Sequence, residues 1–219
     1  IIFFFRINSY IFNRRNMDIK LNSLIALFLI ANISAGHHEG GKMHGNTAEW
    51  EIETYTSSAP DFIGDYATVV SASGEVLREG TNGWTCLPFI AMPKMGFKTA
   101  NEAAPACADA NAVAWADAYI SQSKPEIPND GWIWMIHGDT GVDNFRPYSE
   151  GDKENTDPED WIYSGSHLML MPKDPASLEG VSTDFTTGAP YVMMKGTPFV
   201  HLMIPLEGYY DYQPESAPK

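Results

Sequence analysis

The sequence predicts an α+β fold, in which a mainly antiparallel sheet carries one principal helix at about residues 105–122. Short runs of β-branched, aromatic and aliphatic residues recur along the chain and end at Gly or Pro, as strands do. One segment alone has a clear helical period. Strands and helices do not alternate, so the parallel sheet of an α/β fold is not expected.

The principal helix is predicted in PACADANAVAWADAYISQ, residues 105–122. Pro105 suits a first helical turn, and Pro125 prevents continuation beyond the segment. Cys107 would then lie near the start of the helix. Its apolar stripe is expected at Ala108, Ala112, Trp115, Ala116 and Tyr119.

The remaining segments predict strands and loops. AEWEIETY (48–55) alternates apolar and acidic residues and predicts a short edge strand, with a helical turn as the alternative. GWIWMIH (131–137) is continuously apolar, which is typical of a strand buried on both faces. A long polar loop follows at 138–160. Other strands are predicted in a hairpin at 67–80, at 83–89, at 167–171, and in a terminal hairpin formed by 191–194 and 199–204.

The beginning of the chain has the parts of a secretory signal peptide. Met17 is followed by a charged residue pair, the apolar run LNSLIALFLIANI and the small residues Ser34, Ala35 and Gly36. That run is too short for a membrane span of roughly 20 residues, although an uncleaved anchor is the alternative. We expect residues 1–16 to be a non-native upstream extension, 17–36 a signal peptide, 37–208 one globular domain with a flexible N-terminal arm, and 209–219 a disordered tail.

The net charge of the chain excludes some classes of binding partner. Residues 37–219 contain 10 basic and 27 acidic residues, a formal charge near −17. Such a surface repels phosphate backbones, so no nucleic-acid partner is expected. No second apolar segment is long enough to span a bilayer, so we expect no stable membrane span once the signal is removed. A protein or small-ligand partner is left open.

The chain has two cysteines, Cys86 and Cys107. In an exported protein, periplasmic or extracellular, one pair predicts a disulfide, here closing a loop of about 22 residues. A redox pair or a pair of thiolate ligands is the alternative.

Three stretches, LREGTNGWTC, AWADAY and YVMMKGTPFVHLMIP, resemble a group of exported bacterial proteins with no assigned activity. The resemblance extends over most of the chain after the signal segment. It implies an exported single domain, and it brings no ligand or catalytic residue.

The candidate site is built on strand histidines. Alternation places His167 on one strand face with Met169, and His201 on one face with Met203, while His137 follows Met135 by two residues. Imidazole with thioether suits Cu(I), and imidazole also suits Zn(II). If the strands are neighbours, opposed histidines are expected to share an ion on this methionine-bearing face, leaving the Leu/Ile face under the helix. The alternative is a core histidine hydrogen-bonded in place.

His37 and His38 form a second candidate metal site, because cleavage near residue 36 would place them beside a free amine. No nucleophile elbow, phosphate-binding glycine loop or HExxH pattern is present, so no catalytic residue is assigned. The sequence therefore favours an exported, non-enzymatic binding or accessory domain with a copper or zinc site. A small hydrolase-like enzyme using His137 or His167 as general base is the alternative.

Overall fold

The computed structural model describes residues 45–219, which form one compact unit. The expected upstream extension, the signal peptide, His37 and His38 lie outside the described residues. From residue 45 onward, no helix is both long and apolar enough to cross a membrane.

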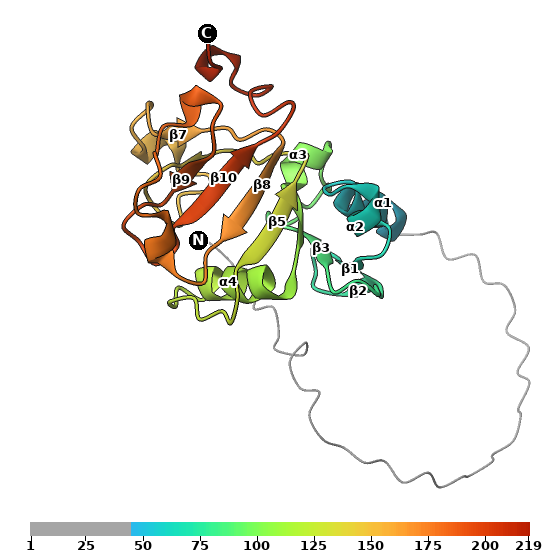
Figure 1. The fold of residues 1–219 in the computed structure, drawn as a ribbon. Coiled ribbons are helices and arrows are strands. Elements are labelled where there is room, and N and C mark those ends of the chain that lie inside the picture. Colours follow the sequence, from blue (N-terminus) through green and yellow to red (C-terminus); the bar gives the residue numbers. More distant parts are fainter. Residues whose placement is uncertain (1–44) are drawn as a thin grey trace, which may run out of the picture. The chain divides into compact units, whose positions relative to one another are not determined.

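An eight-stranded sheet forms the centre of the fold (Figure 1), with the order β2-β1-β3-β4-β5-β8-β10-β9. Only β1 and β3 pair in parallel. The α+β class and the mainly antiparallel sheet are therefore confirmed. The strands are β1 Thr68–Val70, β2 Val76–Arg78, β3 Thr85–Pro88, β4 Pro105–Ala108, β5 Gly131–Met135, β8 His167–Met171, β9 Tyr191–Met193 and β10 His201–Pro205.

The principal helix is shorter than predicted. Helix α4 spans Ala110–Ile120, and Asp109 begins it by accepting a hydrogen bond from the amide of Ala112 at 2.8 Å. The expected first turn is instead strand β4, Pro105–Ala108, which is buried between β3 and β5. Small residues allow this strand to pack closely on both sides. Gly131 on β5 also lies under α4, where an added Cβ would come 2.5 Å from the amide nitrogen of Ala112.

The predicted edge strand at 48–55 is a helix. Helix α1 spans Ala48–Thr56, and Thr47 caps its first turn. The alternation of apolar and acidic residues suggested that every acidic side chain faces solvent, but Glu51 is buried. One of its carboxylate oxygens accepts hydrogen bonds from the Tyr55 hydroxyl at 2.9 Å and from the Ala72 amide at 2.8 Å. Two short helices complete the set, α2 Asp61–Gly64 and α3 Ala100–Ala103.

The two longer helices cover opposite faces of the sheet. Trp115 of α4 packs in a core with Ile133 and Met169, whereas Tyr55 of α1 packs in a second core with Cys86 and Cys107. In Figure 1, α1 and α2 lie beside β1–β3. Because side chains alternate along each strand, neighbouring residues of β4 and β5 contribute to different cores.

The structure reverses the expected roles of the two strand faces. Helix α4 covers the methionine-bearing face, and the Leu/Ile face lies on the other side of the sheet. On that other side, Trp132 is 37% exposed and Trp134 is half-buried. Strand β5 is therefore fully buried on one face only, contrary to the prediction. Leu168 and Leu170 of the neighbouring strand β8, and Leu202 and Ile204 of β10 beyond it, are also only partly buried.

The C-terminal segment packs on the fold from its first residue, unlike the disordered tail expected at 209–219. Tyr209 is 2% exposed, and its hydroxyl hydrogen-bonds to that of Tyr191. The polar loop at 138–160 contains strand β6, Val142–Asp143, which pairs with β7, Trp161–Ile162. Short 3-10 helices occupy Lys153–Asn155, Pro175–Leu178, Phe185–Thr187 and Pro214–Ser216.

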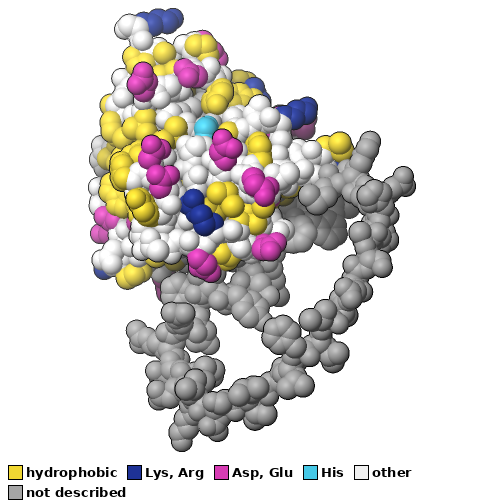
Figure 2. All heavy atoms as spheres, turned by 90° about the vertical axis from the view of Figure 1, so that its right-hand side faces the viewer, with side chains coloured by type: hydrophobic (Ala, Val, Ile, Leu, Met, Phe, Trp, Pro, Cys, Tyr) yellow, Lys and Arg dark blue, Asp and Glu magenta, His cyan; other side chains and the backbone are white. Residues whose placement is uncertain are grey.

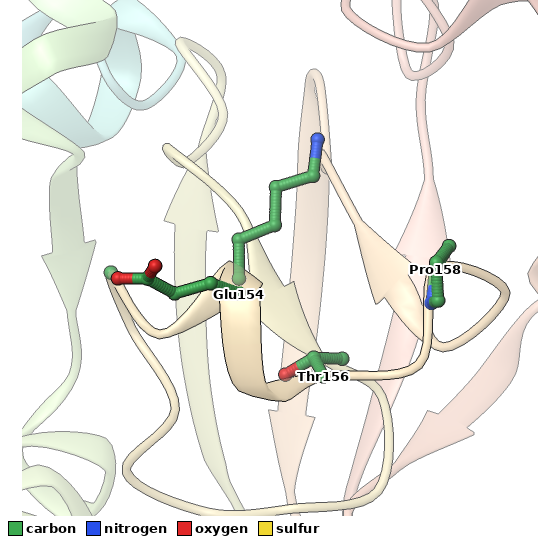
Figure 3. A pocket seen from close by; sticks show the side chains of 5 residues that line it. Glu154, Thr156 and Pro158 are labelled. Carbon is green, nitrogen blue, oxygen red and sulfur yellow. The ribbon is translucent and has the colours of Figure 1, made fainter.

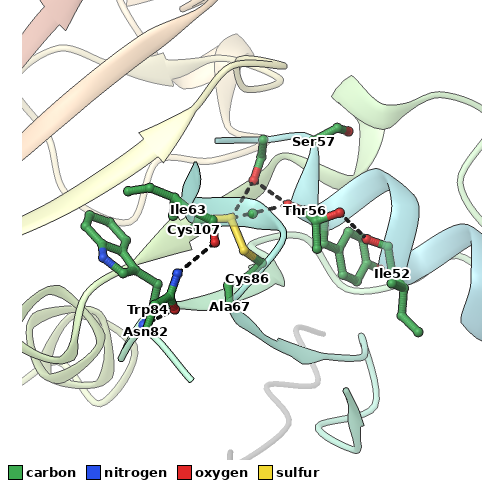
Figure 4. The surroundings of a disulfide bond; sticks show 12 residues. Ile52, Thr56, Ser57, Ile63, Ala67, Asn82, Trp84, Cys86 and Cys107 are labelled. Atoms are coloured by element: carbon green, nitrogen blue, oxygen red, sulfur yellow. Dashed lines mark hydrogen bonds between the residues drawn. A yellow bond between two sulfur atoms is a disulfide. The ribbon is translucent and has the colours of Figure 1, made fainter. Parts of the chain in front are cut away.

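The predicted disulfide is present. Cys86 and Cys107 are opposed residues of β3 and β4, and both are fully buried beneath α1 (Figure 4). The bond therefore joins two neighbouring strands, instead of anchoring the principal helix as expected. Figure 2 shows acidic side chains spread over one face of the molecule, with few basic side chains among them.

Candidate functional site

The two strand histidines lie on the same face of neighbouring strands, but the register separates them. His167 on β8 lies opposite Pro205 on β10, and His201 lies four residues earlier on β10, opposite Met193 of β9. At about 3.3 Å per residue, that offset is roughly 13 Å along the strand. The sequence suggested that directly opposed histidines share one ion. This register does not place the two histidines opposite each other.

His167 is fully buried, and only one of its two ring nitrogens has a hydrogen-bond partner among residues 45–219. Its Nδ1 contacts the carbonyl oxygen of Gly165 at 2.6 Å, whereas Nε2 has no hydrogen-bond partner in this part of the chain. Burial lowers the pKa of this imidazole to about 4, although the Gly165 contact opposes the effect. The ring is therefore neutral at physiological pH, with the proton on Nδ1 and a lone pair on Nε2.

Methionines surround His167 on the methionine-bearing face. Met135 of β5 lies directly opposite His167, and Met169 follows it by two residues on β8. Met203 is the diagonal neighbour on β10, since Pro205 occupies the opposed position. All three methionines are buried in one core. Three thioether side chains thus occupy the positions on this face that are next to His167 in the strand register.

His201 occupies the other end of the same face and has a different environment. Its Nδ1 contacts the carbonyl oxygen of Phe199 at 2.9 Å, and the Trp115 ring packs edge-on at a centroid distance of 5.6 Å. Burial lowers the pKa of His201 to about 4. This histidine fits a core position beneath α4.

His137 lies in the turn that follows β5, outside the sheet that contains His167 and His201. Its Nε2 is 2.8 Å from the Ser57 hydroxyl, at the end of helix α1. The His137 carbonyl accepts hydrogen bonds from Asn101 at 3.0 Å and from Tyr212 at 3.2 Å. Burial lowers the pKa of His137. Across residues 45–219, no three His, Cys, Asp or Glu side chains form a metal-binding group.

A pocket of about 330 Å³ opens beside this loop, lined by Asn101, Asp139, Thr140, Tyr163 and Tyr212. Oδ1 of Asp139 accepts hydrogen bonds from the amides of Gly141 at 3.0 Å and Ser164 at 3.2 Å. Asp139 is half-buried, and it contributes part of the wall of this pocket. Burial raises the pKa of Asp139 to about 7, and the hydrogen bonds from Gly141 and Ser164 oppose that rise.

Beneath Asp139 lies a buried chain of hydroxyl groups. The Tyr209 hydroxyl is 3.4 Å from that of Ser164, and the Tyr191 hydroxyl bonds to Tyr209 in turn. Burial raises the pKa of both tyrosines, so both phenols stay protonated. This chain of hydroxyl groups is uncharged, and its residues are not among those that line the pocket.

A second pocket, of about 660 Å³, lies in the acidic loop. In Figure 3 the side chains of Glu154, Thr156 and Pro158 point in different directions, without converging on a common point. This hollow has no buried polar group among its lining residues, so it lacks the features of a built site.

Sequence reasoning singled out His167, Met169 and Met203 but did not find Met135 as a partner, because pairing of β5 with β8 is not visible in the sequence. It also missed Ser57, Asn101 and Tyr212, which come from distant segments and carry no local motif. No protein-family model matches the chain, and the searches of curated proteins and of solved structures found no match either.

Proposed function

We propose that this chain is an exported, single-domain, non-enzymatic accessory protein that binds a soft metal ion, Cu(I), at His167. The observation that carries the proposal is the fully buried Nε2 of His167, which has no hydrogen-bond partner in the described part of the chain. Leaving a buried polar atom unpaired costs about 1–3 kcal/mol, and a bound metal ion would remove that cost.

The neighbouring ligands favour one metal. Met135, Met169 and Met203 offer thioether sulfurs on the methionine-bearing face. Thioethers with a single imidazole suit Cu(I), whereas Zn(II) sites use imidazole, thiolate or carboxylate ligands. Opposed strand residues have Cβ atoms about 5 Å apart, and the flexible methionine side chain can bring its sulfur to a ligand distance near 2.3 Å.

The other features of the chain agree with export and with a cation as ligand. A buried disulfide is typical of oxidising compartments, and the formal charge of −14 attracts cations. The resemblance to exported bacterial proteins points to the same compartment.

The decisive experiment is an anaerobic Cu(I) titration of purified protein against a competing chelator, with X-ray absorption to identify sulfur ligands. His167→Leu should abolish tight binding. His201→Leu is the matched control, because His201 is also a buried histidine on the same face, and this variant should leave binding unchanged. No Cu(I) binding by the wild type, or equal loss in both variants, would refute the proposal.

A second candidate function rests on the 2.8 Å contact between Ser57 and His137. A serine beside an imidazole is the core of a hydrolase dyad. However, the Ser57 hydroxyl is also 2.9 Å from the Thr54 carbonyl oxygen, so it can donate its proton to that carbonyl and not to His137. Ser57 also lies at the C-terminal end of α1, whose negative partial charge opposes an oxyanion. Covalent labelling of Ser57 by a fluorophosphonate, lost in His137→Ala, would favour the hydrolase.

A further inference from the structure

We propose that the pocket lined by Asn101, Asp139, Thr140, Tyr163 and Tyr212 binds the ammonium group of a small organic amine, with the Asp139 carboxylate as its counter-charge. This site is separate from the methionine-bearing face and does not rest on the proposed metal. Its chemistry follows from the unpaired charge of Asp139, the aromatic walls and the size of the pocket.

Hydrogen bonds hold the Asp139 carboxyl in place. Its Oδ1 accepts hydrogen bonds from the amides of Gly141 and Ser164, and a side-chain hydrogen bond from Ser164 also lowers the pKa of the carboxyl group. Both ion pairs found in that part of the chain involve Arg146, with Asp143 and Asp152. Asp139 is therefore a carboxylate without a cationic partner, positioned by its backbone contacts and facing a pocket.

The charges around Asp139 do not compensate it. Glu150 adds a further negative potential, and the nearby phenols of Tyr191, Tyr209 and Tyr212 are uncharged. Burial of the carboxylate accounts for most of its raised pKa. An ammonium group in the pocket would supply the missing positive charge, and a charge-assisted hydrogen bond is about twice as strong as a neutral one.

The aromatic walls favour the same ligand chemistry. The Tyr212 ring is 47% exposed, and the electron-rich face of a tyrosine attracts ammonium groups. Tyr163 already contacts one ammonium group, because Lys153 Nζ lies 4.8 Å from its ring centroid and 3.1 Å from its hydroxyl, so the ligand is expected to use Tyr212. Asn101 donates to the carbonyls of His137 and Asp139, which fixes the loop that presents the carboxylate.

The volume of the pocket limits the size of the ligand. About 330 Å³ lies at the lower end of the range for small-molecule sites, so a single ring with a short aminoalkyl chain fits, whereas a folded protein partner does not. Thr140, which is exposed at the rim, offers a hydroxyl group to a polar substituent.

The test compares 2-phenylethylamine with its neutral isostere 2-phenylethanol by NMR titration of the ¹⁵N-labelled full chain at pH 8, above the pKa of about 7 that burial gives Asp139, so that its carboxylate is mostly charged. The amine should shift the amide resonances of Gly141 and Ser164, and the alcohol should bind at least about tenfold more weakly. Asp139→Asn keeps an oxygen for both backbone hydrogen bonds but removes the charge, so it should reduce amine affinity by a similar factor.

Glu154→Gln is the matched control, because it removes one negative charge from the same acidic region outside this pocket, and it should leave amine affinity within about twofold. Equal binding of amine and alcohol would overturn the proposal, as would unchanged amine affinity in Asp139→Asn. Equal losses in both variants would show only non-specific attraction to the acidic surface and would also overturn it. If Asp139→Asn fails to fold, the comparison of amine with alcohol on the wild type still decides.

Discussion

Met135 on β5 lies directly opposite His167 on β8, and both side chains are buried on the face that helix α4 covers. The pairing brings a thioether and an unpaired imidazole nitrogen together from segments 32 positions apart in the sequence. The first prediction follows from this pair.

Met135→Leu should weaken Cu(I) binding by about tenfold or more, because it removes one sulfur ligand. It should cost less than about 1.5 kcal/mol of stability, since the two side chains have similar volumes. Met171→Leu, at the far end of β8, is the control and should not change Cu(I) affinity. Chelator competition measures the affinity, and urea unfolding measures the stability. Identical affinities for the two variants would contradict a site at His167.

Cys86 and Cys107 should contribute about 3 kcal/mol to the free energy of unfolding, because their bond closes a loop with a sequence separation of 21. The double variant Cys86→Ala/Cys107→Ala should lower that free energy by this amount while keeping the antiparallel pairing of β3 with β4. Urea unfolding of the oxidised wild type and the variant gives the difference. Two free thiols in the unreduced native protein would contradict the bond itself.

Acid should weaken the fold through its buried histidines. The pKa of His201 falls from 6.5 to about 4 on folding, so the unfolded chain binds more protons between those values. The stabilising effect of a neutral His201 is complete above about pH 6.5 and is lost as pH falls towards 4, by roughly 3 kcal/mol. His167 acts in the same direction. Asp139, whose pKa rises from 3.8 to about 7, has the opposite sign, and its effect is lost as pH increases over that range.

The difference between wild type and His201→Leu isolates the histidine. Relative to wild type, the variant should gain stability progressively as pH falls from about 6.5 to about 4, in urea unfolding at matched ionic strength. A difference that does not vary with pH would show that His201 is not a buried neutral imidazole.

The two faces of β5 should respond differently to the same substitution. Ile133 is 1% exposed, so Ile133→Thr should cost about 3 kcal/mol by burying a hydroxyl and leaving a gap. Trp132 is 37% exposed on the other face, and Trp132→Thr should cost about 1 kcal/mol, because threonine is well tolerated in strands. Thermal and urea unfolding of both variants test this prediction. Equal losses of unfolding free energy would mean that another molecule or segment covers the Trp132 face in solution.

Local patterns in the sequence determined the positions of most strands and the pairing of the cysteines. The hairpin at 67–80, the strand at 167–171 and the terminal hairpin all form where apolar runs end at turn residues. Alternation also predicted correctly that His167 shares its face with Met169. These features depend on backbone geometry within a few residues, and with only two cysteines there is only one possible intramolecular disulfide.

Only the tertiary structure decided the register, the covered face and the pocket. Residues 105–108 have helical signals, yet hydrogen bonds from β3 and β5 make them a strand. His167 lies opposite Pro205, away from His201, because the pairing of β8 with β10 spans a connection of 29 residues, 172–200. Helix α4 covers the methionines and leaves the Leu/Ile face on the other side. Asn101, Asp139, Tyr163 and Tyr212 meet at one pocket because four separate segments end at the same place. Such long-range packing depends on the whole core, and no short stretch of sequence contains it.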